Sequence, residues 1–266
     1  MRRASRLLAS DLDGTLIAIR PEAADVEGVR ALDEAARRAR LSLAYVTGRH
    51  FALAVQGIAE AGLPAPDYLS CDVGTSLYVR DGDQFRLHEA FREAMRTRLA
   101  GAALADVRTR LTEVTYLTLQ PPDRQAEFKL SYFVPGDTPA DAAERVADVL
   151  AGADLDLQVV HSRDPVTGNG LIDVLPPETG KRFTLEFFRR HLELDDRALV
   201  FAGDSGNDRD ALLSGCLGIL VGNAPADLAS ALRREAAALG LADRLYVARA
   251  PGVQGVLEGC RHFTFL

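Results

Sequence analysis

The sequence lacks tryptophan and has only three cysteines among 266 residues. The cysteines are odd in number and do not show the spacing of metal ligands, so neither a disulfide framework nor a zinc site is indicated. No window reaches the roughly 20 apolar residues that a membrane helix needs. The apolar stretch after Met1-Arg2-Arg3 ends at Asp11, too early for a secretory signal. These absences favour a cytoplasmic protein with reduced thiols.

Basic residues are fewer than acidic ones, 31 against 38. The formal net charge is −7 and the sequence pI is about 5.3, with 47% hydrophobic and 26% charged residues. Such a surface repels the phosphate backbone of nucleic acids, so neither a nucleic acid nor a membrane is expected as a partner. The densest basic cluster, Arg37-Arg38-Ala39-Arg40, follows a helical pattern, where it complements the helix dipole. The composition is that of a globular protein with a full hydrophobic core.

Short apolar runs alternate with amphipathic stretches at both ends of the chain. Strands are expected at 6–10, 41–46 and 67–71, and the first helix between them carries an apolar face made of Val26, Val29, Leu32 and Ala36. The alternation resumes after residue 179. This order predicts a parallel sheet with right-handed crossovers. We therefore expect an α/β protein with a doubly wound, Rossmann-like core.

The pattern changes from about Thr75 onward. The Asp-Gly signal in Arg80-Asp81-Gly82-Asp83 predicts a hairpin, and helices and strands then follow in mixed order. Helices are expected at 89–103 and 140–150, and strands at 114–119, 127–134, 155–161 and 171–175. We interpret this region as an inserted α+β cap. The core domain would comprise residues 1–83 and 175–266, and the cap residues 84–174.

The first of four polar motifs, Asp11-Leu12-Asp13-Gly14-Thr15, directly follows the first predicted strand. Two carboxylates two residues apart can face one crevice, and Gly14 permits a sharp turn behind them. A calcium loop is the alternative, with Glu22 at its twelfth position. The glycine comes too early for that loop and apolar residues occupy ligand positions, so a calcium site is disfavoured.

The other three motifs also lie next to predicted core elements. Thr47-Gly48-Arg49 ends a strand, where a hydroxyl and backbone N–H groups can bind an anion, although a threonine there is often only a helix cap. Gly180-Lys181 begins a helix. Gly203-Asp204-Ser205-Gly206-Asn207-Asp208 leaves a buried strand, where acidic residues need a compensating charge such as Mg²⁺. At the carboxyl edge of an open sheet, all four motifs can share one site.

In this order, the four motifs resemble those of the haloacid dehalogenase superfamily. More narrowly, the chain is similar from end to end to the sucrose-phosphate phosphatase family. The segments that carry this resemblance are Leu8-Ala9-Ser10-Asp11-Leu12-Asp13, Leu43-Ala44-Tyr45-Val46-Thr47-Gly48-Arg49, Pro66-Asp67-Tyr68, Lys129-Leu130-Ser131-Tyr132, Asp173-Val174-Leu175-Pro176, Gly203-Asp204-Ser205-Gly206-Asn207-Asp208 and His262-Phe263-Thr264-Phe265-Leu266.

The resemblance implies a mechanism and a cofactor. Asp11 would be the nucleophile that attacks phosphorus, and Asp13 would protonate the leaving sugar oxygen and later deprotonate water. The cofactor would be Mg²⁺, held by the Asp11 carboxylate, the Asp13 backbone carbonyl, Asp204 and Asp208. The chain would then be a phosphoric monoester hydrolase.

The resemblance also implies the groups that bind the phosphate. Thr47 and Lys181 would be catalytic by binding its non-bridging oxygens in the transition state, and the backbone of Gly48 would assist them. Asn207 would orient Lys181 or the metal shell, close to the substrate.

The sugar would be recognised by the cap. On a strand, Lys129 and Ser131 share one face, which we expect to bind sugar hydroxyls with help from Gln125 and Asn169. Leu130 and Tyr132 would then pack on the cap helices. Sucrose 6-phosphate is the first choice of substrate, followed by mannosylfructose phosphate and then general hexose phosphates.

Two other functions remain open from the sequence. A phosphomutase shares the aspartyl-phosphate but returns the phosphate to a sugar. A degenerate, non-catalytic domain would serve a partner enzyme, and a sugar-phosphate synthase is the protein partner to consider. The presence of every expected catalytic residue favours the phosphatase.

Overall fold

The computed structural model describes residues 6–18, 23–135, 139–163 and 168–266. The chain forms two compact units. The first comprises Met1–Gly74, Tyr78–Arg86 and Gly180–Leu266, and the second comprises Thr75–Leu77 and Leu87–Thr179. The expected boundaries differ at three places. Residues 75–77 and 175–179, expected in the core, belong to the second unit, and residues 84–86, expected in the cap, belong to the first.

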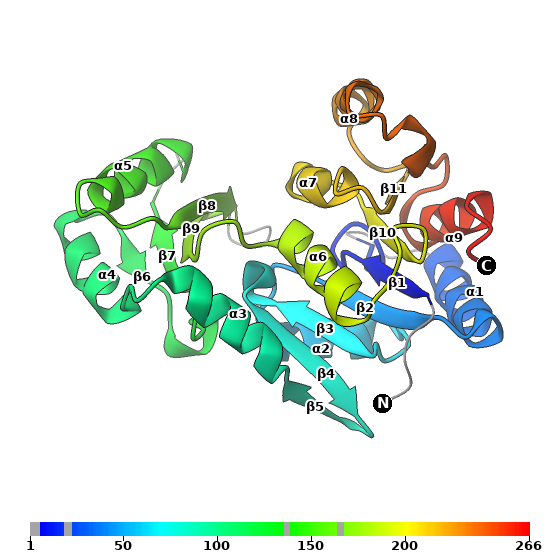
Figure 1. The fold of residues 1–266 in the computed structure, drawn as a ribbon, viewed down its shortest axis with the longest axis horizontal. Coiled ribbons are helices and arrows are strands. Elements are labelled where there is room, and N and C mark those ends of the chain that lie inside the picture. The colour runs from blue at the N-terminus through cyan, green and yellow to red at the C-terminus, as the bar shows by residue number, and fades with distance from the viewer. Residues whose placement is uncertain (1–5, 19–22, 136–138, 164–167) are drawn as a thin grey trace. The chain divides into compact units, whose positions relative to one another are not determined.

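The first unit is built on an eight-stranded sheet of order β12-β11-β10-β1-β2-β3-β4-β5 (Figure 1). From β12 to β3, each strand pairs in parallel with its neighbour. The predicted doubly wound α/β class is therefore confirmed. The strand bounds are β1 Leu7–Ser10, β2 Ser42–Val46, β3 Tyr68–Cys71, β4 Ser76–Asp81, β5 Gln84–Leu87, β10 Leu199–Gly203, β11 Leu217–Leu220 and β12 Leu245–Val247.

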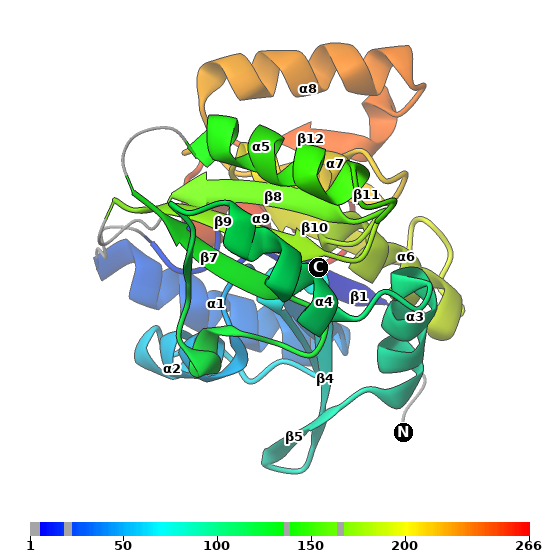
Figure 2. The same cartoon turned by 90° about the vertical axis from the view of Figure 1, so that its left-hand side faces the viewer.

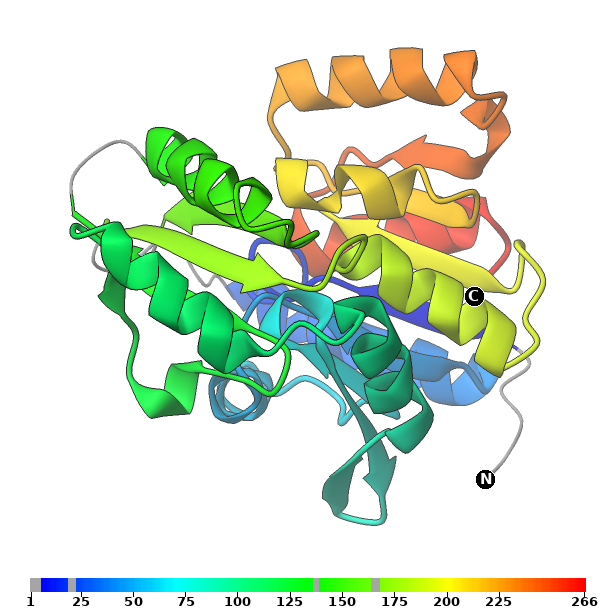
Figure 3. The same cartoon turned by 60° about the vertical axis from the view of Figure 1, so that its left-hand side comes forward.

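Helices cover both faces of this sheet (Figure 3). Leu8 and Tyr45 point to one face and share a hydrophobic cluster with Leu32 of α1. On the other face, Tyr68 contacts Phe188 of α6 with ring centroids 5.2 Å apart. Burial on both faces explains why the core strands are almost wholly apolar. The helices are α1 Ala23–Ala39, α2 Phe51–Glu60, α6 Lys181–His191, α7 Arg209–Leu212, α8 Ala226–Ala238 and α9 Gly252–His262.

One residue of the expected helix face is misplaced. Val29, Leu32 and Ala36 are buried on α1, but Val26 is 55% exposed. An α-helix turns by about 100° per residue, so each step of three residues falls about 60° short of a full turn. The spacing of three from Val26 to Leu32 therefore carries Val26 off the buried stripe, and its assignment to that face was wrong.

The second unit contains a four-stranded antiparallel sheet of order β6-β7-β9-β8. Leu130 and Tyr132 of β7 join a buried cluster with Val107 of α4 and Val146 of α5. Both helices therefore pack on one face of the sheet (Figure 2). The bounds are α3 Glu89–Leu99, α4 Leu104–Arg110, β6 Thr118–Leu119, β7 Leu130–Val134, α5 Pro139–Ala151, β8 Gln158–Arg163 and β9 Gly170–Leu175.

Several expected elements of this unit are shorter than the sequence pattern indicates, and one of them, the strand predicted at 127–134, begins only at Leu130. The helix predicted at 89–103 ends at Leu99, because Ala100 adopts a left-handed conformation with φ 48°. The strand predicted at 114–119 is reduced to Thr118–Leu119, since a 3-10 turn at Leu111–Glu113 precedes it. None of the helices in the described ranges combines the length and hydropathy that a membrane crossing requires.

Leu32 provides a test of the packing in the first unit. Its side chain is 0% exposed, so Leu32→Ala should lower the free energy of unfolding by about 2–5 kcal/mol through lost burial and a cavity. Leu239, which is 60% exposed, is the matched control, and its alanine variant should change stability by about 0.5 kcal/mol or less. Urea denaturation followed by circular dichroism measures both. Equal losses would contradict the assigned core.

Candidate active site

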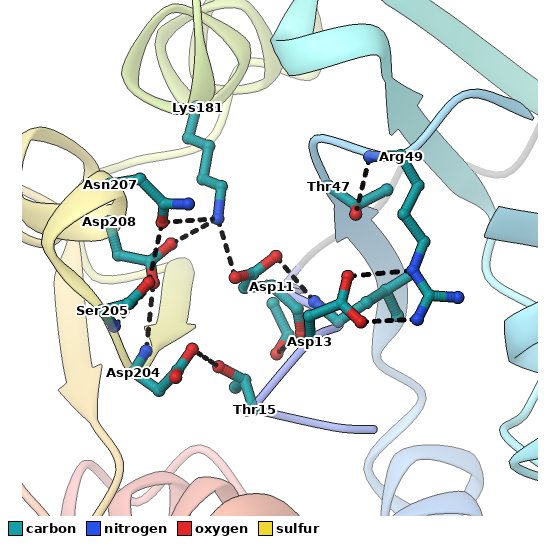
Figure 4. Close-up of polar contacts among 12 residues, drawn as sticks. Asp11, Asp13, Thr15, Thr47, Arg49, Lys181, Asp204, Ser205, Asn207 and Asp208 are labelled. Atoms are coloured by element: carbon teal, nitrogen blue, oxygen red, sulfur yellow. Dashed lines mark hydrogen bonds and ion pairs between the residues drawn. The ribbon is translucent and has the colours of Figure 1, made fainter. Parts of the chain in front are cut away.

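Polar residues from neighbouring strands meet at the carboxyl edge of the core sheet (Figure 4). Asp11 follows β1, Thr47 follows β2 and Asp204 follows β10, and these three strands are adjacent. Parallel strands present their carboxyl ends at one edge, so residues far apart in the sequence come together there. Lys181, the first residue of α6, points to the same place.

Lys181 lies between two buried carboxylates. Its Nζ is 2.8 Å from Asp11 Oδ2 and 2.6 Å from Asp208 Oδ1, and it donates to Asn207 Oδ1 at 3.2 Å. The side chains of Lys181, Asp11 and Asp208 are 10%, 6% and 0% exposed. Charges so far from water require close partners, and here one cation serves two anions.

Burial and the excess of carboxylates over cations shift the pKa values of these groups. Burial raises the pKa of Asp11 from 3.8 to about 7, with Lys181 lowering it and Asp208 raising it further. Burial, followed by the nearby Asp208, also raises the pKa of Asp204. For Lys181, burial lowers the pKa but the two carboxylates raise it by more, so the amine stays charged. The cluster therefore holds three carboxyl groups against one ammonium group, so negative charge is in excess when they are ionised.

Gly14 makes room for Asp204. It has φ 77°, and a Cβ at this position would lie 2.3 Å from Asp204 Oδ2. The other oxygen of Asp204 accepts a hydrogen bond from Thr15 Oγ1 at 3.0 Å. The Asp11 loop and the Asp204 loop can therefore approach each other only because residue 14 has no side chain.

The Asp208 side chain closes its own loop. Its Oδ2 accepts hydrogen bonds from the backbone N–H groups of Asp204 at 3.0 Å and Ser205 at 3.1 Å, while Oδ1 faces Lys181. Asn207 Oδ1 accepts from both Lys181 and Ser205. The short 3-10 turn Gly206–Asp208 thus aligns both acceptors with the lysine.

Three carboxylates fit a divalent cation. Asp11, Asp204 and Asp208 each offer an oxygen, and these oxygens lie within 4.8 Å of one another. Oxygen ligands from one or two carboxylates, completed by water and phosphate, are what Mg²⁺ prefers. The residues present therefore fit the expected metal. The Asp13 carboxylate is not in this group, and its predicted contribution was its backbone carbonyl.

The remaining predicted core residues border the cluster. The Asp13 side chain is 52% exposed and forms an ion pair with Arg49. Thr47 is buried, and its Oγ1 accepts a hydrogen bond from the Arg49 N–H at 3.2 Å. Gly48 is exposed, and no atom lies within 4 Å of a Cβ built on it.

The predicted sugar-binding residues belong to the second unit. Lys129 is 5% exposed and Ser131 is 0% exposed, and the Ser131 hydroxyl bonds to Asp173 Oδ1 at 2.5 Å. The side-chain amide of Gln125 donates to the carbonyls of Gln120 and Ser131 and accepts from the Ser131 N–H. Gln125 therefore fixes the backbone before β7, and both its N–H donors are engaged.

Asn169 is exposed and precedes β9, where Gly170 pairs with Val134. Ser131 pairs with Asp173 nearer the other end of the same ladder. At about 3.3 Å per residue, Asn169 lies about 13 Å from Asp173 along the strand. The structure thus brings Ser131 and Gln125 together but not Asn169.

Five polar residues whose contacts are described here were not among the predicted site residues. Asn223 donates to the Gly14 carbonyl and accepts from the Gly252 N–H, each at 2.8 Å. It follows β11, so the rule that placed Asp11 and Asp204 could have found it. The other four lie within or beside quoted motifs but were given no role: Thr15, Arg49, Asp173 and Ser205.

Comparison with known proteins gives consistent results over the whole chain. The family described as sucrose-6F-phosphate phosphohydrolase matches residues 4–264. A mannosylfructose-phosphate phosphatase of Agrobacterium fabrum is 30% identical, over 97% of this chain and 96% of that protein. A putative HAD-like hydrolase of Nitrosococcus oceani is 34% identical, over 97% of this chain and 71% of that protein. The solved sucrose-phosphatase of Synechocystis, in complex with sucrose and phosphate, has a TM-score of 0.77 at 25% identity over 98% of each chain.

The raised pKa of Asp11 predicts a gain in stability when its charge is removed. The cost of ionising Asp11 in the folded chain is absent below its usual pKa of 3.8, grows up to about 7 and is complete above that value. In EDTA near pH 8, Asp11→Asn should therefore raise the free energy of unfolding by on the order of 1–4 kcal/mol. Asp208 keeps Lys181 paired in the variant.

This difference should shrink as the pH falls toward about 4, where Asp11 is neutral in the folded wild type and only partly ionised in the unfolded chain. Urea denaturation at several pH values measures it. Asp148→Asn, at an exposed position on α5, is the control and should show no such trend. An Asp11→Asn protein that is less stable than wild type near pH 8 would refute the electrostatic description of the cluster.

Proposed function

Because the chain belongs to the sucrose-6F-phosphate phosphohydrolase family and is a phosphoric monoester hydrolase, we propose that it removes phosphate from a sugar phosphate through an aspartyl-phosphate on Asp11. The observation that carries the proposal is the pairing of Asp11 Oδ2 with the buried Lys181 ammonium at 2.8 Å. A buried carboxylate beside a fixed cation suits attack on a phosphate dianion, because the cation offsets repulsion between them.

In the first step, an Asp11 oxygen forms a bond to phosphorus and the bond from phosphorus to the sugar oxygen breaks. Asp13 gives a proton to that leaving oxygen. Lys181 and Thr47 bind the non-bridging oxygens as their charge changes in the transition state, where one such donor contributes roughly 3–4 kcal/mol. Asn207 keeps the ammonium in place through the contact at 3.2 Å.

In the second step, Asp13 accepts a proton from water while the water oxygen attacks phosphorus. The bond between phosphorus and the Asp11 oxygen breaks, which releases inorganic phosphate and restores both aspartates to their starting states. One residue thus serves as acid and then as base, so no other proton carrier is needed.

Asp11, Asp204 and Asp208 would hold Mg²⁺, with the backbone carbonyl of Asp13 as a further ligand. When bound, the metal supplies positive charge that offsets repulsion between the carboxylates and the phosphate. The chain's own contribution is to hold three carboxylate oxygens within 4.8 Å of one another. The raised pKa values of Asp11 and Asp204 are what such a site shows without its cation.

The two lysines of the chain support a role for Lys129 in substrate binding. Of the 31 basic residues only Lys129 and Lys181 are lysines, and the rest are arginines. Lys129 is buried and the Lys181 side chain is only 10% exposed, whereas lysine is ordinarily a surface residue. A compact ammonium and a planar guanidinium are not interchangeable in a confined polar site. We assign Lys181 to the phosphate and Lys129 to sugar hydroxyls.

Sucrose 6-phosphate is the proposed substrate, with mannosylfructose phosphate second and hexose phosphates third. The family name, the Agrobacterium relative and the Synechocystis structure support a phosphorylated disaccharide. Ser131 and Asp173 lie on the same sheet face as Lys129 and add a hydroxyl and a carboxylate to it. A synthase partner and a cytoplasmic location remain predictions.

Removal of the nucleophile tests the chemistry. Asp11→Asn should lower phosphate release more than about 10³-fold, because the amide oxygen cannot form the covalent intermediate. EDTA should abolish wild-type activity, and Mg²⁺ should restore it. Phosphate release without an added bisphosphate separates a phosphatase from a phosphomutase. Asp148→Asn is the control. Activity of Asp11→Asn within about tenfold of wild type would refute the mechanism.

A substrate panel tests the sugar assignment. We expect kcat/KM for sucrose 6-phosphate to exceed that for glucose 6-phosphate and fructose 6-phosphate by about 10²-fold or more, because buried polar groups reject analogues that leave them unpaired. Lys129→Ala should remove most of this preference, and Lys129→Arg should not restore it. Arg145→Ala, at an exposed position on α5, is the control. Equal rates on all three sugars, or no effect at Lys129, would refute the assignment.

A further inference from the structure

Arg49 holds the Asp13 carboxylate with two hydrogen bonds (Figure 4). Its Nε donates to Oδ2 at 2.9 Å and its Nη2 to Oδ1 at 2.5 Å. Within the described part of the chain, no other residue donates a hydrogen bond to this carboxylate. A bidentate pair fixes the plane of a carboxylate as well as its position. The orientation of Asp13 is therefore determined by Arg49.

The guanidinium is itself fixed by helix α2. Its Nη1 donates to the Leu53 carbonyl at 3.3 Å, and a Cβ at Gly57 would lie 2.1 Å from the same nitrogen. Glycine inside a helix costs about 1 kcal/mol relative to alanine. The Arg49 guanidinium occupies the space that a methyl group at position 57 would fill.

The backbone of Arg49 is held as well. Its N–H donates to Thr47 Oγ1 at 3.2 Å, and its carbonyl accepts from the Asp72 N–H at 2.9 Å. Asp72 follows β3 and has a left-handed φ of 55°. Arg49 is thus fixed by groups from the ends of β2 and β3 and from α2, far more than an ordinary surface ion pair requires.

We infer that Arg49 is a positioning residue for Asp13. The absence of a side chain at Gly57 makes room for the Arg49 guanidinium. The inference rests on the proposed function, in which Asp13 transfers protons to the sugar oxygen and from water. The Asp13 side chain is 52% exposed, so without the two hydrogen bonds from Arg49 it can rotate into solvent. Arg49 holds the ionised carboxylate, the form that takes a proton from water in the second step, in one orientation, which reduces the ordering required for that transfer. In the first step Asp13 carries a proton, and the oxygen that carries it donates to the leaving oxygen in place of accepting from Arg49.

The test uses Arg49→Gln and Gly57→Ala, assayed on the sugar phosphate that proves best in the panel above. Both should lower kcat by about 10–100-fold with little change in KM, because orientation and not substrate binding is lost. Arg49→Lys should recover only part of the rate, since an ammonium cannot form the planar pair of hydrogen bonds that a guanidinium makes to a carboxylate. Alanine has a higher helix propensity than glycine, but its methyl group at position 57 would lie 2.1 Å from Arg49 Nη1 and 3.3 Å from Ile17 Cδ1, so the stability of this variant is measured as well.

The decisive measurement is the double variant Arg49→Gln, Asp13→Asn. If Arg49 acts through Asp13, the double variant should be no slower than Asp13→Asn alone. Arg86→Gln, which removes an exposed pair with Asp81, and Gln56→Ala on α2 are controls and should match wild type. Thermal unfolding of every variant establishes that it is folded.

Three outcomes would overturn the inference. Losses that multiply in the double variant would show that Arg49 acts independently of Asp13, and an effect confined to KM would assign it to substrate binding. Wild-type kcat in Gly57→Ala would refute the claim that Arg49 depends on the space at Gly57. These failures leave the proposed function intact if Asp13→Asn is slow. An Asp13→Asn protein as fast as wild type would refute the proton-transfer role itself.

Discussion

The burial of Lys181 between Asp11 and Asp208 is the interaction on which the site depends. Three charges lie almost out of contact with water, and their mutual attraction must offset the loss of hydration. The balance is incomplete, because burial and Asp208 raise the pKa of Asp11 to about 7. A protein selected for stability alone would not keep this arrangement. Its retention is understandable if a cation and a phosphate dianion complete the charge balance during function.

The rest of the core brings the polar loops of the site to one edge of the sheet. The loops that follow β1, β2 and β10 carry polar groups of the site, and buried apolar layers on both faces hold the strand ends in register. Close approach then depends on space. The absence of a side chain at Gly14 admits Asp204, and its absence at Gly57 admits Arg49. Side-chain volume at two positions therefore sets the geometry of charged groups far away in the sequence.

Strand order and motif position made the fold class and the gathering of Asp11, Thr47, Lys181 and Asp204 predictable, and the resemblance to sucrose-phosphate phosphatases is confirmed. What the sequence could not supply depends on side-chain rotamers and exact helix phase. The pair of hydrogen bonds from Arg49 to Asp13 could be predicted only if the position of α2 were known. The exposure of Val26 needs the rotation of α1, and a spacing of three is ambiguous over two turns.

The scarcity of lysine has a consequence for chemical modification. Amine-directed reagents and enzymes that acetylate or glycate ε-amino groups normally find many targets on a protein surface. Here the chain offers two such groups, Lys129, which is buried, and Lys181, whose side chain is 10% exposed, so labelling through ε-amines would report directly on the environments of both. Cross-linkers that join surface lysines would find none to join, whereas the abundant arginines would respond to dicarbonyl reagents.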